Sequence, residues 1–186
     1  MAGDFVLRIE AIRKQARQHI DQGPITEDYG QDRDRVVNVL NEVLATEIVC
    51  ILRYMRHYYV ADGIDGESVK DEFLEHAREE ADHADRAAKR IVQLGGEPDL
   101  NPAILAKRSH TEYAEGGGLA GMLEEDLVAE RIAVASYREI VRWLGDGDPT
   151  TRVVMEGLLA DEEEHADDLR SLLARVDRGG ARTRPA

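Results

Sequence analysis

The sequence contains four long stretches in which apolar residues recur every three or four positions, the pattern of a helix with one buried face. They span residues 33–61, 66–94, 119–144 and 149–176. Short connections join the first two and the last two stretches, so each pair is expected to pack antiparallel. The segment 95–118 could cross the whole bundle, because a helix of about 27 residues spans about 40 Å. The spacing therefore predicts an all-α four-helix bundle with one long crossover.

The flanking segments are predicted to be accessory to this bundle. Residues 1–31 hold an extra short N-terminal helix, expected over 4–22, and a linker with turn residues over 23–31. The bundle domain is expected over 32–176, and the polar tail 177–186 is expected to be disordered. Asp148 and Pro149 match the N-cap and the first position of the last helix.

The net charge of −14 limits the partners of this chain. Such an acidic protein repels nucleic acid and anionic membranes over most of its surface. No stretch approaches the roughly 18 apolar residues of a membrane span, and the first residues do not resemble a secretory signal. We therefore expect a cytoplasmic protein with no membrane partner. Cys50 is the single cysteine, so no intrachain disulfide is expected, and it should pack as a small apolar side chain.

Each predicted helix carries a glutamate near its middle, within the apolar face. A glutamate on a solvated face is ordinary, but these four have apolar residues one turn away on both sides. Two of them are followed three residues later by a histidine, a spacing that places both side chains on one helix face. The six residues are Glu47, Glu80, His83, Glu130, Glu162 and His165.

Four carboxylates that converge inside a bundle need positive charge among them, because burying an unpaired carboxylate is costly. Two divalent cations balance four carboxylates, and neutral imidazoles complete the ligand set. One glutamate from each of two helices, with Glu-x-x-His from the other two, is the layout of di-iron carboxylate bundles. Carboxylates and imidazoles without thiolate suit iron or manganese, and zinc is possible. The sequence therefore predicts two metal ions, with iron favoured.

Four segments resemble the helices of bacterioferritin and Dps-like miniferritins: LNEVLATEIVCILRY, EEADHADRAAKRIVQLGGEPDLN, EDLVAERIA and DEEEHADDL. The likeness covers about residues 36–173 and implies a ferritin-like bundle with a bacterioferritin-type di-iron site inside one chain. It also assigns a place to each of the six residues. Glu47 and His83 would be terminal ligands of one metal and Glu130 and His165 of the other, with Glu80 and Glu162 bridging the pair.

The resemblance adds further candidates around the metals. Tyr54 matches a tyrosine near the di-iron centre and is the candidate catalytic residue; a purely structural core aromatic is the alternative. Asp126 and Asp161 each lie one turn before a predicted ligand and could orient a ligating imidazole. Their alternative interpretation is an exposed acid.

Three departures from bacterioferritin or from the Dps-like proteins qualify the resemblance. Ala81 stands where bacterioferritin has its haem-binding methionine, so no haem is predicted. A fifth helix after residue 176 is not expected, which favours a 12-subunit shell over a 24-subunit one, and residues 104–114 could form the small extra helix of miniferritins. Cys50 stands alone where related Dps-like proteins often have a cysteine pair, so thiol redox chemistry is not expected.

The resemblance implies iron storage and detoxification with ferroxidase activity. Fe(II) would be oxidised by O2 or H2O2 and stored in a homo-oligomeric shell. The alternative is a non-storage di-metal oxidoreductase, either a peroxidase or a manganese-catalase-like enzyme, and a metal-free structural bundle is also considered. DNA protection would require a basic patch. The candidates are Arg8, Arg13, Lys14 and Arg17 near the N-terminus and Arg178, Arg182 and Arg184 in the tail. A solvated face explains them better, so DNA binding is not expected.

Overall fold

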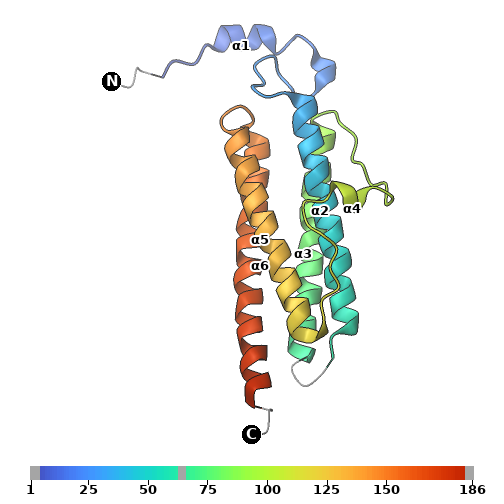
Figure 1. Cartoon of the computed structure of the whole chain (residues 1–186). Helices are drawn as coiled ribbons and strands as arrows, with labels where there is room; N and C mark the ends of the chain where they lie inside the picture. The colour runs from blue at the N-terminus through green and yellow to red at the C-terminus, as the bar shows by residue number, and fades with distance from the viewer. Residues whose placement is uncertain (1–4, 63–65, 183–186) are drawn as a thin grey trace.

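The computed structural model describes residues 5–62 and 66–182, and within them it contains helices and no strand. Four long helices run side by side (Figure 1). They are α2 (Arg33–Val60), α3 (Gly66–Gln93), α5 (Gly118–Leu144) and α6 (Pro149–Arg182). Helix α2 packs mainly on α3, and α5 packs mainly on α6. The predicted bundle of two helical hairpins is therefore confirmed.

Two aspartates cap helices at the starts predicted from the sequence. The side chain of Asp32 accepts a hydrogen bond from the backbone N–H of Arg35 at 3.1 Å and begins α2. Asp148 accepts the N–H of Thr151 at 2.9 Å, with Pro149 as the first residue of α6. Each cap satisfies a backbone donor that has no partner inside its helix. Asp148 is thus the N-cap that the sequence predicts.

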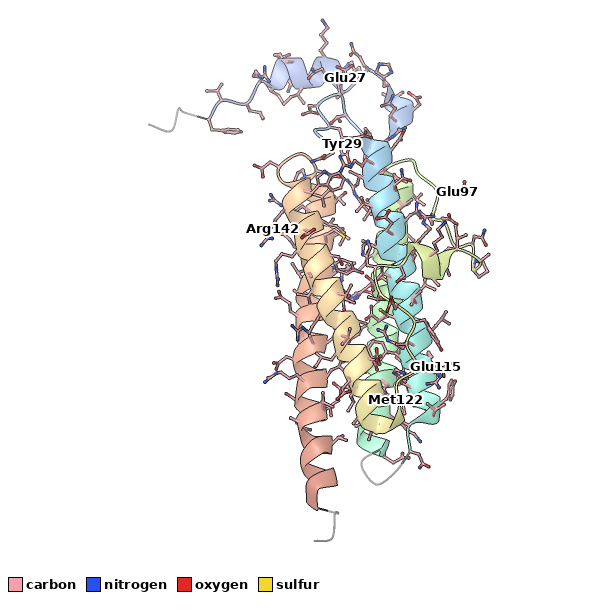
Figure 2. All side chains as sticks on the ribbon, viewed as in Figure 1. Glu27, Tyr29, Glu97, Glu115, Met122 and Arg142 are labelled. Carbon is pink, nitrogen blue, oxygen red and sulfur yellow. The ribbon has the colours of Figure 1, made fainter. Side chains whose placement is uncertain are left out.

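The connection between α3 and α5 runs along the outside of α2. Asn41 holds its first part, donating to the carbonyl of Glu97 at 3.2 Å and accepting from the N–H of Asp99 at 2.7 Å. Farther along, Thr46 accepts the N–H of His110 at 2.9 Å. Figure 2 shows Glu97 and Glu115 well apart along the bundle axis. The segment is therefore the long crossover, and its small helix α4 (Leu105–Arg108) lies within the expected range 104–114.

The apolar core is divided into two clusters. One includes Leu40, Leu44, Ile91 and Met155, all fully buried. The other lies farther along the bundle and includes Phe73, Leu123 and Leu169. Each fully buried side chain of this size contributes about 1.5–3 kcal/mol. The two clusters enclose the level at which the predicted metal ligands lie.

The N-terminal region contains less helix than predicted. The structure has a short helix α1 (Ile9–Gln15) and a 3₁₀ turn (Ile20–Gln22) in place of one helix over 4–22; residues 1–4 lie outside the described part. Figure 1 shows α1 projecting from one end of the bundle. No residue of α1 is buried, so no packing supports a longer helix.

The linker, in contrast, packs on the α5–α6 turn, where Figure 2 places Tyr29. The hydroxyl of Tyr29 donates to Asp148 at 2.7 Å, and the N–H of Gly30 donates to the carbonyl of Gly147 at 3.1 Å. A Cβ on Gly30 would lie 2.9 Å from the Cα of Gly147, so this close approach needs glycine.

At the other end of the chain, α6 continues to Arg182 instead of stopping at 176. The expectation of a disordered tail over 177–186 is therefore wrong for residues 177–182. Residues 183–186 lie outside the described part of the chain. The prediction gave too much weight to Gly179 and Gly180. Each glycine costs a helix only about 1 kcal/mol relative to alanine, and the residues around them are good helix formers.

Candidate metal centre

The structure brings the six predicted metal ligands together at the middle of the bundle. All are buried, with exposed fractions of 3% or less. Nδ1 of His83 lies 3.3 Å from both Glu80 and Glu162 and 3.8 Å from Glu47. Nδ1 of His165 lies 3.3 Å from Glu162 and 3.7 Å from Glu80. The four glutamates come from four different helices, so the centre depends on assembly of the whole bundle.

The ligand atoms form two overlapping groups. In each group, one potential ligand atom per residue lies within 4.8 Å of the others. Glu80 and Glu162 belong to both groups, as bridging carboxylates would. The other members divide between the groups as the family resemblance implies. The first group is completed by Glu47 and His83, and the second by Glu130 and His165.

The unsatisfied polar atoms provide the test of whether metal fits. Buried polar groups in folded proteins nearly always have a hydrogen-bond partner. In the described residues, nine buried side-chain N and O atoms lack one, and seven belong to this cluster. They are both carboxylate oxygens of Glu80 and of Glu162, one oxygen of Glu130, and Nδ1 of His83 and of His165. All seven can donate a lone pair, so the residues present fit cations at the centre.

In both histidines, Nε2 contacts a carboxylate outside the cluster, and Nδ1 therefore faces the cluster. Nε2 of His83 lies 3.1 Å from Asp161, and Nε2 of His165 lies 2.8 Å from Glu79. Each carboxylate accepts the Nε2–H, so an imidazole that loses its second proton when metal binds directs its Nδ1 lone pair inward. Asp161 thus contacts a predicted ligand. That ligand is His83 on α3, however, and not His165 one turn farther along α6. Glu79 was missed because it stands in a run of acids with nothing to distinguish it.

Two tyrosines contact the predicted terminal glutamates. The hydroxyl of Tyr54 donates to Glu130, and the hydroxyl of Tyr137 donates to Glu47. Burial raises the pKa of both phenols well above the usual value, so both remain protonated donors. Tyr54 therefore lies at the centre, as the resemblance implies. Tyr137 was not predicted at the centre, since its spacing also fits an apolar face.

Asp126 does not orient a ligating imidazole. It is fully buried between Arg53 and His57, 2.7 Å from each. Both partners also hold the crossover, since Arg53 donates to the carbonyl of Glu112 at 3.1 Å and Nε2 of His57 lies 3.0 Å from the carbonyl of Glu115. This network is not apparent from the sequence. Arg53 and His57 lie beside the apolar face of their helix, where a charged or polar side chain is ordinarily exposed to solvent.

Cys50 is buried, as expected, but its surroundings are partly polar. Its sulfur lies 3.5 Å from the guanidinium of Arg53 and 3.7 Å from the hydroxyl of Thr111. Burial raises the pKa of this thiol well above the usual value. A protonated, enclosed thiol is a poor nucleophile and a poor metal ligand.

Without metal, protons compensate the crowded carboxylates. Burial and the charge of Glu80 raise the pKa of Glu47 to about 8. Burial, with the charge of Glu162, raises the pKa of Glu130 well above its usual value. Burial opposes the charged form of His165, but hydrogen bonds to Glu162 and Glu80 raise its pKa to about 12. Protons and metal ions therefore compete for the same ligand atoms.

A pocket of about 440 Å³ lies between α3 and α6, next to the centre. Seven carboxylates and three imidazoles line it, and no lysine or arginine is among these described lining residues. Burial, followed by the charges of Asp168, Glu75 and Glu79, raises the pKa of Glu72 in its wall. His83 and His165 belong both to this wall and to the cluster. The pocket is therefore a strongly negative approach to the centre.

Comparisons with known proteins bear on the family and the fold of this chain. A family model described as a ferritin-like domain matches residues 37–179. A nutrient stress-induced DNA-binding protein of Synechococcus is 31% identical over 138 residues, which cover 73% of this chain and 78% of the relative. A bacterioferritin of Rhodobacter capsulatus is 30% identical over 147 residues, which cover 78% and 87%. The bacterioferritin-related, dodecameric thioferritin of Bacteroides fragilis superposes with a TM-score of 0.79 at 30% identity, over 84% of this chain and 94% of that chain.

Proposed function

Because the chain belongs to the ferritin-like family, we propose that it oxidises Fe(II) at a di-iron centre within each subunit and stores the product. One observation carries this proposal: seven buried lone-pair donors from three of the four long helices converge without hydrogen-bond partners. Relatives of this chain include bacterioferritins and proteins named for DNA binding and DNA protection. Iron storage is the function that a buried carboxylate and imidazole cluster supports best.

Each side chain has a defined task in this proposal. Glu47 and His83 hold one iron, and Glu130 and His165 hold the other. The bridging glutamates keep the two sites close, and Tyr54 and Tyr137 fix the orientation of the terminal carboxylates. Each Fe(II) would lose one electron and become Fe(III). The two electrons, with two protons from solvent, would reduce O2 to H2O2 or H2O2 to two waters. We propose no haem, since Ala81 offers no axial ligand.

The activity can be tested by anaerobic loading with Fe(II) followed by addition of O2 or H2O2. The double variant Glu80→Gln, Glu162→Gln removes both bridging charges and should lose rapid oxidation and tight metal binding. Glu163→Gln is the matched control, because Glu163 is an exposed neighbour whose oxygen pairs with Arg138 at 2.6 Å. Fast oxidation that persists in the double variant would contradict the proposal.

The assembly distinguishes storage from the alternative, a non-storage di-metal oxidoreductase of the peroxidase or manganese-catalase type. We propose a homo-oligomeric shell of 12 subunits, which is supported by the dodecameric relative from Bacteroides fragilis. Solution mass and the iron retained per assembly decide between the two functions. A dimer that turns over peroxide and retains only two metal ions per chain would favour the oxidoreductase.

DNA protection is a second candidate function, although the charge of the chain argues against it. Relatives named as DNA-binding and DNA-protection proteins favour it. The exposed helix α1 also carries Arg13 and Lys14, beside Arg8 and Arg17. A gel-shift assay at low salt, with and without substitution of these four residues by alanine, tests it. Retardation that disappears in the substituted protein would establish DNA binding through α1 and its flanks.

A further inference from the structure

The pocket between α3 and α6 holds a group of possible ligands outside the di-iron centre. Potential ligand atoms of Glu72, His76 and Asp168 lie within 4.8 Å of one another. His76 is only 2% exposed, whereas the two carboxylates are partly exposed on facing helices. None of the three is among the six predicted ligands. The group therefore requires an explanation of its own.

The hydrogen bonds of His76 determine what its second nitrogen can do. Nδ1 lies 3.3 Å from the hydroxyl oxygen of Tyr54. The single proton of that hydroxyl is donated to Glu130, which is ionised when it binds a metal. The oxygen of Tyr54 must then accept the Nδ1–H of His76. A neutral His76 is left with its lone pair on Nε2, on the side of Glu72.

Two acceptors consequently face each other across this group. Nε2 of His76 lies 3.5 Å from a carboxylate oxygen of Glu72, and neither atom has a proton to share when the carboxylate is ionised. Asp168 adds a second carboxylate from α6. Imidazole and carboxylate lone pairs that face one another are unfavourable unless a proton or a cation lies between them, and a divalent cation satisfies all three residues at once. One imidazole and two carboxylates form a ligand set for Fe(II), Mn(II) or Zn(II) that leaves positions for water.

We propose that Glu72, His76 and Asp168 form a third divalent-cation site at the entrance to the di-iron centre. Its position supports a role in supplying that centre. The ring of His76 stacks on that of His165 with 4.1 Å between centroids, and His76 and His165 both line the pocket. A cation held here lies one imidazole away from the second iron position. Both the tautomer of His76 and this transfer role rest on the proposed function, because Glu130 accepts from Tyr54 as an ionised carboxylate when it binds a metal.

Another set of ligands in the same pocket is a weaker choice. His76, Glu79 and His165 also have potential ligand atoms within 4.8 Å of one another. However, Nε2 of His165 and the carboxylate of Glu79 already satisfy each other at 2.8 Å, and that bond directs Nδ1 of His165 toward the di-iron centre. A cation bound there would break this bond. The set with Glu72 and Asp168 leaves it intact.

Binding of Co(II) to the metal-free, fully assembled protein tests the site. Calorimetry under anaerobic conditions should give three Co(II) ions per chain for the unmodified protein. Glu72→Gln and Asp168→Asn should each lose the third ion and keep the other two. Glu75→Gln is the control, because Glu75 lines the same pocket and has the same charge but is outside the group, so it should keep all three ions.

Anomalous diffraction from Co(II)-soaked crystals locates the ions. The expected result is a peak between Glu72, His76 and Asp168, in addition to two peaks at the bundle centre. Only two peaks, or loss of the third ion in Glu75→Gln as well, would overturn the third site and leave the proposed function standing. Absence of both peaks at the centre would overturn the proposed function, on which the argument for the third site rests.

The transfer role has a kinetic test of its own. In Fe(II) oxidation, Glu72→Gln should raise KM several-fold and leave kcat close to that of the unmodified protein, because the di-iron ligands are untouched. Glu75→Gln should change KM much less. An unchanged KM in Glu72→Gln would overturn the transfer role.

Discussion

At the scale of single residues, the two halves of the metal centre have the same construction. In each half a tyrosine hydroxyl holds the terminal glutamate, and a carboxylate outside the cluster holds the histidine. Tyr137 and Asp161 serve one half, and Tyr54 and Glu79 serve the other. The inner ligand atoms are thereby oriented before any metal arrives, which lowers the cost of binding.

This construction predicts the effect of removing one outer carboxylate. Asp161→Asn should weaken metal binding by about 10- to 100-fold, because an amide does not fix the Nδ1 tautomer of His83 as a carboxylate does. Calorimetric titration with Co(II) measures the change. Asp167→Asn is the control, since Asp167 is exposed and pairs with Arg170 on the surface. Equal affinities for Asp161→Asn and the unmodified protein would show that the contact has no orienting role.

The raised pKa of Glu47 predicts how metal affinity depends on pH. In the metal-free protein this carboxyl keeps its proton up to about pH 8, compared with 4.5 for its ordinary value. Below pH 8 a metal ion must displace that proton, so the apparent affinity should rise by about tenfold per pH unit for this one proton. Above pH 8 this contribution disappears. Co(II) titrations between pH 6 and 9 measure the slope, and an affinity independent of pH would contradict the assignment.

The six candidate ligands and their burial were predictable because their position within apolar faces makes them improbable as solvated residues. Glu79 and Tyr137 were not predictable in the same way. An acid that supports a histidine has the same spacing as an ordinary surface acid, and a tyrosine that donates to a ligand has the same spacing as a core aromatic. Their roles depend on which helix packs opposite, and a single sequence does not state that.

At the scale of the elements, the crossover is anchored to α2 by buried charges. Arg53 and His57 share Asp126 on α5 and hold the backbone of the crossover near Glu112 and Glu115. This network lies one side chain away from Tyr54, which follows Arg53 in the chain. The residues that hold the crossover therefore lie next to the tyrosine that donates to one predicted terminal glutamate.

Removal of one partner from this network should be costly. Arg53→Met leaves Asp126 buried with less positive charge, and breaking such a pair typically costs about 3–5 kcal/mol. Chemical denaturation measures this loss, and hydrogen exchange should speed up at residues 112–115. Arg56→Met is the control on the same helix. Arg56 reaches Glu115 at the surface, where a pair contributes at most about 1 kcal/mol. Equal losses in the two variants would contradict the buried anchor.

Helix boundaries in the bundle were predictable because caps and connections mark them. Asp148 with Pro149 gave the start of α6, and the length of segment 95–118 gave the crossover. The N-terminal helix was overestimated because amphipathic periodicity alone does not provide a surface to pack against. The end of α6 was underestimated because glycine weakens a helix without forbidding it.

At the scale of the whole molecule, the candidate metal centre lowers the stability of the bundle when no metal is bound. Four glutamates meet between the two apolar clusters, and without metal they are compensated only by protons and two imidazoles. Burial of charge in this way is expensive, and the apolar clusters on either side offset it. None of the helices in the described residues is long and apolar enough to cross a membrane.

This opposition predicts that metal reverses which of two proteins is the more stable, the unmodified protein or a variant without the bridging charges. Without metal, the double variant Glu80→Gln, Glu162→Gln should be more stable than the unmodified protein by about 1–4 kcal/mol, because two like charges are removed from the interior. With Co(II) the unmodified protein should become the more stable, because only its folded state binds the ions tightly. Thermal unfolding in the presence of chelator and of Co(II) measures which protein is the more stable in each condition. Glu163→Gln should follow the unmodified protein in each condition. A double variant that is less stable than the unmodified protein in chelator would mean that the bridging glutamates support the fold even without metal.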